Sequence, residues 1–288
     1  MPLLFALSVW ASGRQTKTAY RALSFCEDSQ IAEFFIREVV MTQVKTCLIL
    51  AAGNGTRLRP VSGGFPKPLV HFRAKPILEH VIVRARKAGI EKFVIVVGYR
   101  SDLIRNWFDH RWLGKASVTW IENPDYHKSN GISALAAKDE IKENFLLLMA
   151  DHIFEPETAR RLLHQTVAPG EVILAVDSGI GRIFDLDDAT KVRREDNKIV
   201  EIGKNLTNYD ALDTGMFLCS PALFGKLESA IVDGNCSLSD GMGQLAGERR
   251  LRALEIGDAQ WQDVDTPEAL AYAETIFGGH LFHEPVAA

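Results

Sequence analysis

Short apolar runs alternate with amphipathic segments from Lys45 to Asp151, and this alternation constrains the fold more than any other feature. A buried strand of a parallel sheet appears as a continuous apolar run, whereas a covering helix places apolar residues three and four positions apart. The order is strand, helix, strand, helix, strand, helix and strand. It predicts an α/β domain whose largely parallel sheet is covered by helices on both faces.

The expected elements can be placed along the chain by these patterns. Strands are expected in the first half at 47–51, 93–98, 117–122 and 144–151, with helices at 76–89, 101–110 and 132–141. The second half has more strands and fewer helices, with strands at 171–177, 189–195, 197–203 and 213–220 and helices at 220–231, 238–247 and 266–277. We therefore expect a mixed sheet, or a β-rich lobe added to the first half.

Composition places the chain among ordinary globular proteins, since 47% of its 288 residues are hydrophobic and 24% are charged. The net charge of -4 gives no indication of a nucleic-acid partner, so a nucleotide ligand would need locally placed cations. Four scattered cysteines without a C-x-x-C pair favour reduced thiols in the cytoplasm over a zinc site or a disulfide framework. No apolar run approaches the roughly 18 residues of a membrane span, so no membrane insertion is expected.

The N-terminal part of the chain differs from the rest. Residues 1–40 begin with an apolar stretch that lacks the basic segment of a secretory signal, and a second methionine, Met41, follows them. We expect these residues to be an extension outside the core, although helical spacing within 27–40 allows one short docked helix. The core domain is expected over 41–279, followed by a tail at 280–288.

A glycine-rich turn follows the first expected strand, in the sequence C-L-I-L-A-A-G-N-G-T-R from Cys47 to Arg57. Glycines after a strand allow backbone N–H groups to approach an anion, because no Cβ intervenes. The Rossmann dinucleotide fingerprint requires a third glycine where Leu58 stands, and a Walker A loop requires G-K-[ST] where Lys67 lies between two prolines. Both of these common phosphate loops are therefore excluded.

The remaining pattern, A-A-G-x-G-T-R and then P-K-P-L after a buried strand, resembles the signature of the sugar-phosphate nucleotidyltransferases over 45–277. The resemblance implies a Rossmann-like, GT-A-like fold with a central mixed, mostly parallel sheet. It also implies a turn that wraps a nucleoside triphosphate, formed by Ala51, Ala52, Gly53, Asn54, Gly55 and Thr56. Arg57 would grip the β- and γ-phosphates and Lys67 the α-phosphate. The alternative is a basic surface loop with an ordinary turn.

Two carboxylates are candidates for a Mg²⁺ site. Asp151 ends an expected buried strand, where ligands of open α/β sheets bind, although it could also cap the following helix. The resemblance makes Asp263 its partner. Asp265 precedes a threonine and a proline that look like a helix start, so we assign it mainly to structure and Asp263 to the metal. His152 is expected to be structural.

Other residues acquire roles only through the resemblance. Asn130 and Gly131 would pack against the base and ribose, although a plain N-cap turn is equally open for Asn130. Lys204 would bind the phosphate of the acceptor. Asp213 and Thr214 would face a hydroxylated acceptor, although Asp213 could be an ordinary turn residue.

Within the family, strings such as M-A-D-H-I-F and W-Q-D-V-D-T-P-E-A-L resemble the cytidylyltransferase domain that makes CDP-inositol from CTP and inositol 1-phosphate. That domain is often fused to a membrane-embedded CDP-alcohol phosphotransferase, whereas no transmembrane segment follows here. The product would then feed a separate membrane enzyme, or the acceptor differs.

Alternatives to inositol 1-phosphate are phosphocholine, an aminophosphonate or a hexose 1-phosphate. A choline-type acceptor would need an aromatic cage, for which the candidates are Trp120, Tyr126, Tyr209 and Trp261. A nucleotide-binding regulatory protein without turnover is a further alternative, and the retention of Arg57, Lys67, Asp151 and Asp263 argues against it. Oligomeric state has no sequence signal.

Overall fold

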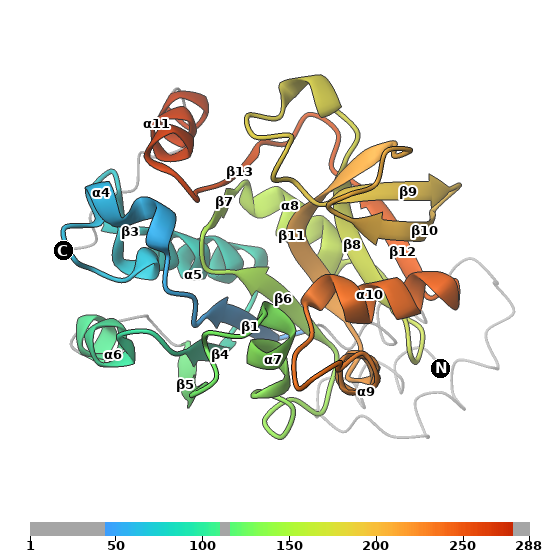
Figure 1. Ribbon diagram of the computed structural model, residues 1–288, viewed down its shortest axis with the longest axis horizontal. Helices are drawn as coiled ribbons and strands as arrows, with labels where there is room; N and C mark the ends of the chain where they lie inside the picture. Colours follow the sequence, from blue (N-terminus) through green and yellow to red (C-terminus); the bar gives the residue numbers. More distant parts are fainter. Residues whose placement is uncertain (1–43, 110–115, 279–288) are drawn as a thin grey trace, which may run out of the picture. The chain divides into compact units, whose positions relative to one another are not determined.

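A computed structural model describes residues 44–109 and 116–278 of the chain (Figure 1). The expected extension at 1–40, its short helix and the tail at 280–288 lie outside the described residues. The centre of the described part is a nine-stranded sheet in the order β5-β4-β1-β6-β11-β8-β12-β10-β9. Two small pairs, β2 with β3 and β7 with β13, stand apart from it.

The first half of the chain forms the parallel part of this sheet. Its strands are β1 (Thr46–Ala51), β4 (Lys92–Val97), β5 (Ser117–Glu122) and β6 (Phe145–Met149). β1 lies between β4 and β6, pairs in parallel with both, and is buried along its whole length. A strand covered on both faces must be apolar throughout, which explains the uninterrupted run in the sequence.

The second half continues the sheet in mixed orientation. Its strands are β8 (Val172–Asp177), β9 (Lys191–Glu195), β10 (Lys198–Gly203), β11 (Ala211–Cys219) and β12 (Leu251–Glu255). β11 pairs antiparallel with both β6 and β8, and β12 pairs in parallel with β8. Within the described sheet, all strands except β10 and β11 run in one direction. The expected mixed, mostly parallel sheet is thus confirmed.

Helices cover both faces of the sheet. One apolar cluster joins one face of β1 to α5 (Ile77–Ala88), α6 (Ser101–Asp109), α8 (Pro156–Leu163) and α11 (Pro267–Ile276). A second cluster joins the opposite face to α7 (Asn130–Leu135), α9 (Ala222–Ser229) and α10 (Leu238–Gly247). Alternate residues of β1 therefore belong to different cores, with Ile49 in the first and Leu48 in the second. No helix in the described ranges has the length and apolarity needed to cross a membrane.

Three short segments carry residues of the glycine-rich region and its surroundings. They are the 3-10 helix η1 (Thr56–Leu58), α4 (Arg59–Ser62) and the 3-10 helix η2 (Lys67–Leu69). The hairpin of β2 (His71–Phe72) and β3 (Lys75–Pro76) leads from η2 into α5. A further 3-10 helix, η3 (Ile180–Arg182), follows β8.

Some elements differ from the expectation. The helix expected at 132–141 starts earlier and ends earlier, as α7, because residues beyond Leu135 continue as turns with i to i+3 hydrogen bonds, such as Lys138 N–H to Leu135 C=O. α8, β12 and the paired strands β7 (His152–Phe154) and β13 (Trp261–Asp263) were not predicted. β7 and β13 are three residues long, too short to show a periodicity.

Candidate active site

The site forms where neighbouring strands end. β1 leads into the glycine turn and β6 leads into Asp151, and the two strands are hydrogen-bonded neighbours, with Ala150 N–H donating to Leu50 C=O. Carboxyl ends of parallel strands share one edge of a sheet, which places the turn and the carboxylate beside each other.

Within the glycine turn, Gly55 is in the left-handed conformation with φ of 57°. A Cβ at this position would lie 2.4 Å from Cβ of Lys67, so only glycine allows the turn to lie against that lysine. The side chains of Ala51 and Ala52 are buried, whereas Gly53, Asn54 and Thr56 are exposed. The two alanines could thus meet a nucleotide only through their backbone.

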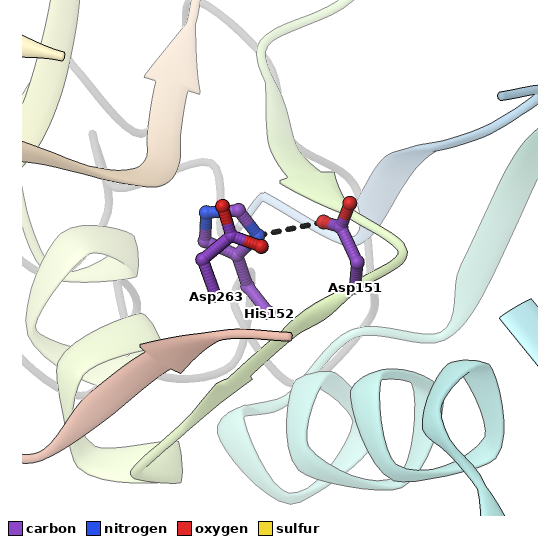
Figure 2. A group of neighbouring side chains, drawn as sticks. All are labelled: Asp151, His152 and Asp263. Carbon is purple, nitrogen blue, oxygen red and sulfur yellow. Dashed lines mark hydrogen bonds and ion pairs between the residues drawn. The ribbon is translucent and has the colours of Figure 1, made fainter. Parts of the chain in front are cut away.

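Strand β13 returns the end of the domain to this edge. It pairs antiparallel with β7, with Asp263 opposite His152, and the next residue, Val264, donates its N–H to the Asp151 carbonyl at 3.0 Å. Figure 2 shows Asp263 in front of the His152 ring, with the ring turned toward Asp151. The potential ligand atoms of these three side chains lie within 4.8 Å of one another.

This cluster fits a divalent cation. Asp263 Oδ1 is buried without a hydrogen-bond partner, and its nearest cation is Lys67 Nζ at 3.9 Å. His152, which was expected to be structural, belongs to the cluster and holds Asp151 through a 2.7 Å hydrogen bond from Nδ1 to Oδ1. Two carboxylates together with phosphate oxygens are a ligand set that Mg²⁺ accepts.

Lys67 lies at the centre of the charged groups. Its ammonium donates to Asp151 Oδ2 at 2.5 Å and to Asp265 Oδ1, and its side chain is only 10% exposed. Burial alone would lower the pKa of Lys67, but the carboxylates of Asp151, Asp263 and Asp265 outweigh burial and raise that pKa above its ordinary value. The lysine is therefore held as a cation beside Asp151 and Asp263.

Asp265 makes contacts beyond the helix start to which the sequence assigned it. The N-cap of α11 is Thr266, whose hydroxyl accepts from Ala269 N–H at 3.1 Å. The Asp265 carboxylate instead accepts from Lys67 and from Arg57. A usable signal was present in the sequence, because Asp263 and Asp265 flank the buried Val264 and so lie on one side of an extended chain.

His152, Asp263 and Asp151 shift one another's pKa values. Desolvation would lower the pKa of His152, but Asp263 and Asp151 raise it to about 9. Burial and the Asp151 carboxylate raise the pKa of Asp263 to about 7, although His152 and Lys67 oppose this. Burial would also raise the pKa of Asp151, yet Lys67 and His152 hold it well below its usual range. Asp263 is thus the carboxylate with the least compensated charge, since its Oδ1 has no hydrogen-bond partner and its pKa is raised.

Asp265 connects Arg57 to Lys67, and Asp188 connects Arg57 to Lys204. Arg57 donates to Asp188 Oδ2 at 2.7 Å, and Lys204 donates to Asp188 Oδ1 at 2.5 Å. Both cations are about half exposed, so a ligand from solution can reach them. Asp188 was not predicted, since it stands in a run of surface aspartates without a distinguishing pattern.

A cavity of about 360 Å³ opens beside the cluster and is lined by Asp151, His152, Asp213, Lys204, Trp261 and Asp263 among others. Asp213 lies on its wall, where burial raises the pKa of its carboxyl to about 6 although Gly215 N–H donates to it at 2.7 Å. Thr214 does not face the cavity: it is fully buried and its hydroxyl donates to the Ala175 carbonyl at 2.8 Å. We therefore remove Thr214 from the acceptor residues.

The structure also gives the surroundings of Asn130, of Gly131 and of the aromatic candidates for a choline cage. Asn130 is exposed at the cavity wall and its side-chain oxygen accepts from Leu238 N–H at 2.8 Å, while the N-cap of α7 is Ser129. Gly131 is buried, and a Cβ there would lie 2.6 Å from the Cys236 carbonyl, so this glycine serves packing. Of the four aromatic cage candidates, only Trp261 lines the cavity, so they do not converge on it.

The fold and the site define a class of protein. A glycine turn against a buried lysine, with paired carboxylates at the same sheet edge, is an arrangement suited to holding a triphosphate and a divalent cation together. Residues 47–254 match the family described as MobA-like NTP transferase domain. The chain belongs to this nucleotidyltransferase family.

Relatives narrow the comparison. The chain is 39% identical to the bifunctional IPC transferase and DIPP synthase of Rubrobacter xylanophilus over 233 residues, which cover 80% of this chain and 51% of that protein. The protein of the same name from Aquifex aeolicus is 33% identical, with coverage of 80% and 51%. The chain thus spans about half the length of these relatives.

Solved structures agree in fold. The inositol-1-phosphate CTP transferase from T. maritima superposes with a TM-score of 0.70 at 24% identity, covering 81% of this chain and 97% of that chain. A UDP-glucose pyrophosphorylase complexed with UDP-glucose superposes with a TM-score of 0.71 at 18% identity, covering 82% and 98%. These likenesses establish the Rossmann-like, GT-A-like nucleotidyltransferase fold.

Proposed function

We propose that this chain transfers a cytidylyl group from CTP to inositol 1-phosphate with Mg²⁺, giving CDP-inositol and pyrophosphate. The observation that carries the proposal is the position of Lys67, packed under Gly55 and bonded to Asp151 beside Asp263. The names of the two bacterial relatives, which contain the term IPC transferase, support the choice of acceptor.

The reaction needs positioning more than proton transfer. A phosphate oxygen of the acceptor attacks the α-phosphorus of CTP, a new P–O bond forms, and the bond to the β-phosphate oxygen breaks as pyrophosphate leaves. A phosphate monoester is ionised at neutral pH and is itself the nucleophile, so no general base is required. Lys67 and Arg57 would hold the triphosphate, and Lys204 would hold the acceptor phosphate.

Asp151 and Asp263 would hold Mg²⁺, which when bound neutralises charge that develops on the phosphate oxygens. The cavity wall would bind the rest of the acceptor. Its carboxylates, including Asp213, can accept hydrogen bonds from hydroxyl groups, which suits a polyol. The aromatic candidates do not converge, and this disfavours a choline acceptor.

Location and pathway follow as parts of the proposal. Cys47, Cys219 and Cys236 are buried free thiols, which supports a reducing cytoplasmic setting. Because the two relatives are named as bifunctional, we propose that CDP-inositol is the substrate of a membrane CDP-alcohol phosphotransferase.

A pyrophosphate-release assay tests the function directly. It crosses the four nucleoside triphosphates with inositol 1-phosphate, phosphocholine and glucose 1-phosphate, in Mg²⁺ and in EDTA. We expect release only with CTP, inositol 1-phosphate and Mg²⁺ together. Release only with another acceptor would refute inositol 1-phosphate as the acceptor but support nucleotidyl transfer. CTP binding without release for every acceptor would favour a regulatory protein.

A further inference from the structure

One carboxylate joins two cations that the sequence assigned to different substrates. Arg57 stands in η1 next to the glycine turn, and Lys204 directly follows β10. Asp188, between η3 and β9, meets Arg57 Nη1 through Oδ2 at 2.7 Å and Lys204 Nζ through Oδ1 at 2.5 Å. The two cations therefore converge on the space occupied by a single anionic group.

A phosphate group would occupy the same space with stronger bonds. Guanidinium and ammonium groups both bind phosphate, and a phosphate offers three oxygens and more negative charge than a carboxylate. We propose that Arg57 and Lys204 form one phosphate-binding site, and that Asp188 fills this site as an internal competitor until a substrate phosphate displaces it. This inference rests on the proposed function, assigns Lys204 to the same phosphate as Arg57, and adds a regulatory contact.

The Asp188 side chain is free to leave. Its carboxylate is one-third exposed, and within the described ranges its side-chain hydrogen bonds are those with Arg57 and Lys204. The two cations hold the pKa of Asp188 below its ordinary value although burial opposes them, so the carboxylate is charged. Departure of this side chain breaks surface ion pairs, which are individually weak.

The surrounding segment is anchored by other contacts. The Phe184 and Tyr272 rings stack with centroids 4.9 Å apart. Arg182 donates to the buried Asp177 at 3.0 Å and to the Gly257 carbonyl at 2.9 Å. Displacement of Asp188 can therefore be a movement of one side chain while the segment between β8 and β9 keeps its attachments.

Two consequences distinguish a competitor from a supporting residue. Neutralising Asp188 should tighten phosphate binding, because the anion no longer has to displace a carboxylate. A carboxylate that merely positions the two cations would have the opposite effect, since its loss would free them and weaken binding. The sign of the change in affinity therefore decides between the two roles.

The test measures pyrophosphate binding to the full chain by calorimetry in EDTA, without nucleotide or acceptor. We expect Asp188→Asn to bind pyrophosphate about two- to tenfold more tightly than the unaltered chain, from the usual strength of two exposed ion pairs. The matched control is Asp187→Asn, which removes the same charge from an exposed neighbour that does not line the cavity. It should change the affinity less than twofold.

A second variant guards against a folding artefact. Lys204→Ala should weaken pyrophosphate binding, and the gain from Asp188→Asn should shrink in that background because one of the two relieved cations is missing. Thermal unfolding midpoints of all variants confirm that they are folded. An affinity for Asp188→Asn that is unchanged, weaker or unmeasurable would overturn the proposal, as would an equal gain in Asp187→Asn.

The inference and the proposed function can fail separately. Tighter pyrophosphate binding by Asp188→Asn, in a chain that releases no pyrophosphate from CTP, would support the phosphate site and refute the proposed reaction. Release from CTP, with no gain in pyrophosphate affinity for Asp188→Asn, would support the reaction and refute the role of Asp188 as a competitor.

Discussion

Lys67, Asp265 and Arg57 show how single residues combine local and distant constraints. Lys67 is held in place by its flanking prolines and by Gly55, but its partners, Asp151 and Asp265, follow β6 and β13. Asp265 bridges Lys67 and Arg57, the two cations that the proposed function assigns to the triphosphate. Because a shared carboxylate fixes the separation of the two cations, it acts on the chemistry although it is not expected to touch substrate.

Two adjacent substitutions separate this role from helix capping. Asp265→Asn should lower the rate of pyrophosphate release about 10- to 100-fold with a small change in stability, because two cations lose their shared anion. Thr266→Ala should instead destabilise the fold by about 1 kcal/mol through loss of the α11 cap and leave the rate nearly unchanged. Steady-state kinetics and thermal unfolding check both. The reverse pattern would return Asp265 to a structural role.

The titration of the carboxylate cluster predicts how stability depends on pH in EDTA. Asp263 has a pKa of about 7 when folded, above the value of about 3.9 for an exposed aspartate. His152 has a pKa of about 9 when folded, above about 6.5 for an exposed histidine. Both groups bind protons more tightly in the folded state, so stability present at low pH is lost as pH rises through these values.

We therefore expect the unfolding midpoint in EDTA to fall between about pH 5 and pH 9. Asp263→Asn should remove the part of the decline below about pH 7. Saturating Mg²⁺ should reduce the decline as well, because a cation binds the deprotonated ligands. A midpoint that is flat or rises with pH in the unaltered chain, or an unchanged slope in Asp263→Asn, would contradict the assignment.

At the scale of elements, the site depends on two features, of which only one can be predicted from the sequence. The turn after β1 is local, and its glycine spacing is readable from the sequence. The pairing of β7 with β13 is not local, yet it alone brings Asp263 next to His152 and Asp151. Short strands of this kind are specified by the partners they find, and not by their own propensity.

Gly55 and Gly63 offer a matched test of the turn. Both have φ near 57°, so alanine strains both by about 1 kcal/mol or more. A Cβ at Gly55 would also strike Lys67 at 2.4 Å, whereas a Cβ at Gly63 would meet its nearest side chain only at 3.9 Å. Gly55→Ala should therefore abolish pyrophosphate release, and Gly63→Ala should retain most of it. Equal activities would mean that the contact with Lys67 is unimportant.

At the scale of the molecule, the described residues between 44 and 278 form two apolar clusters on a common sheet. Both apolar clusters and every candidate site residue lie within it. Figure 1 shows α5 and α8 on one side of the central sheet and α7, α9 and α10 on the other. The two-sided cover leaves the carboxyl edge of β1 and β6 as the place where functional loops gather.

This arrangement predicts the outcome of a truncation. A chain that starts at Met41 should keep pyrophosphate release within about twofold of the full chain and a similar unfolding midpoint, since it retains every described site and core residue. The activity assay and thermal unfolding of both chains provide the check. A large loss of either property would show that residues 1–40 belong to the working domain.

The sequence by itself determined the α/β class, the glycine turn and the individual charged residues at strand ends. Periodicity and turn chemistry are local, so they survive in a single sequence. Arg57, Lys67, Asp151 and Asp263 were all identified in this way or through the resemblance that the turn carries. Only the tertiary structure decided which side chains are in contact. Asp265 contacts Lys67, and His152 contacts Asp151. Thr214 points into the core, and Asp188 links Arg57 to Lys204. Side-chain direction depends on strand pairing between distant segments, and no local pattern encodes that pairing.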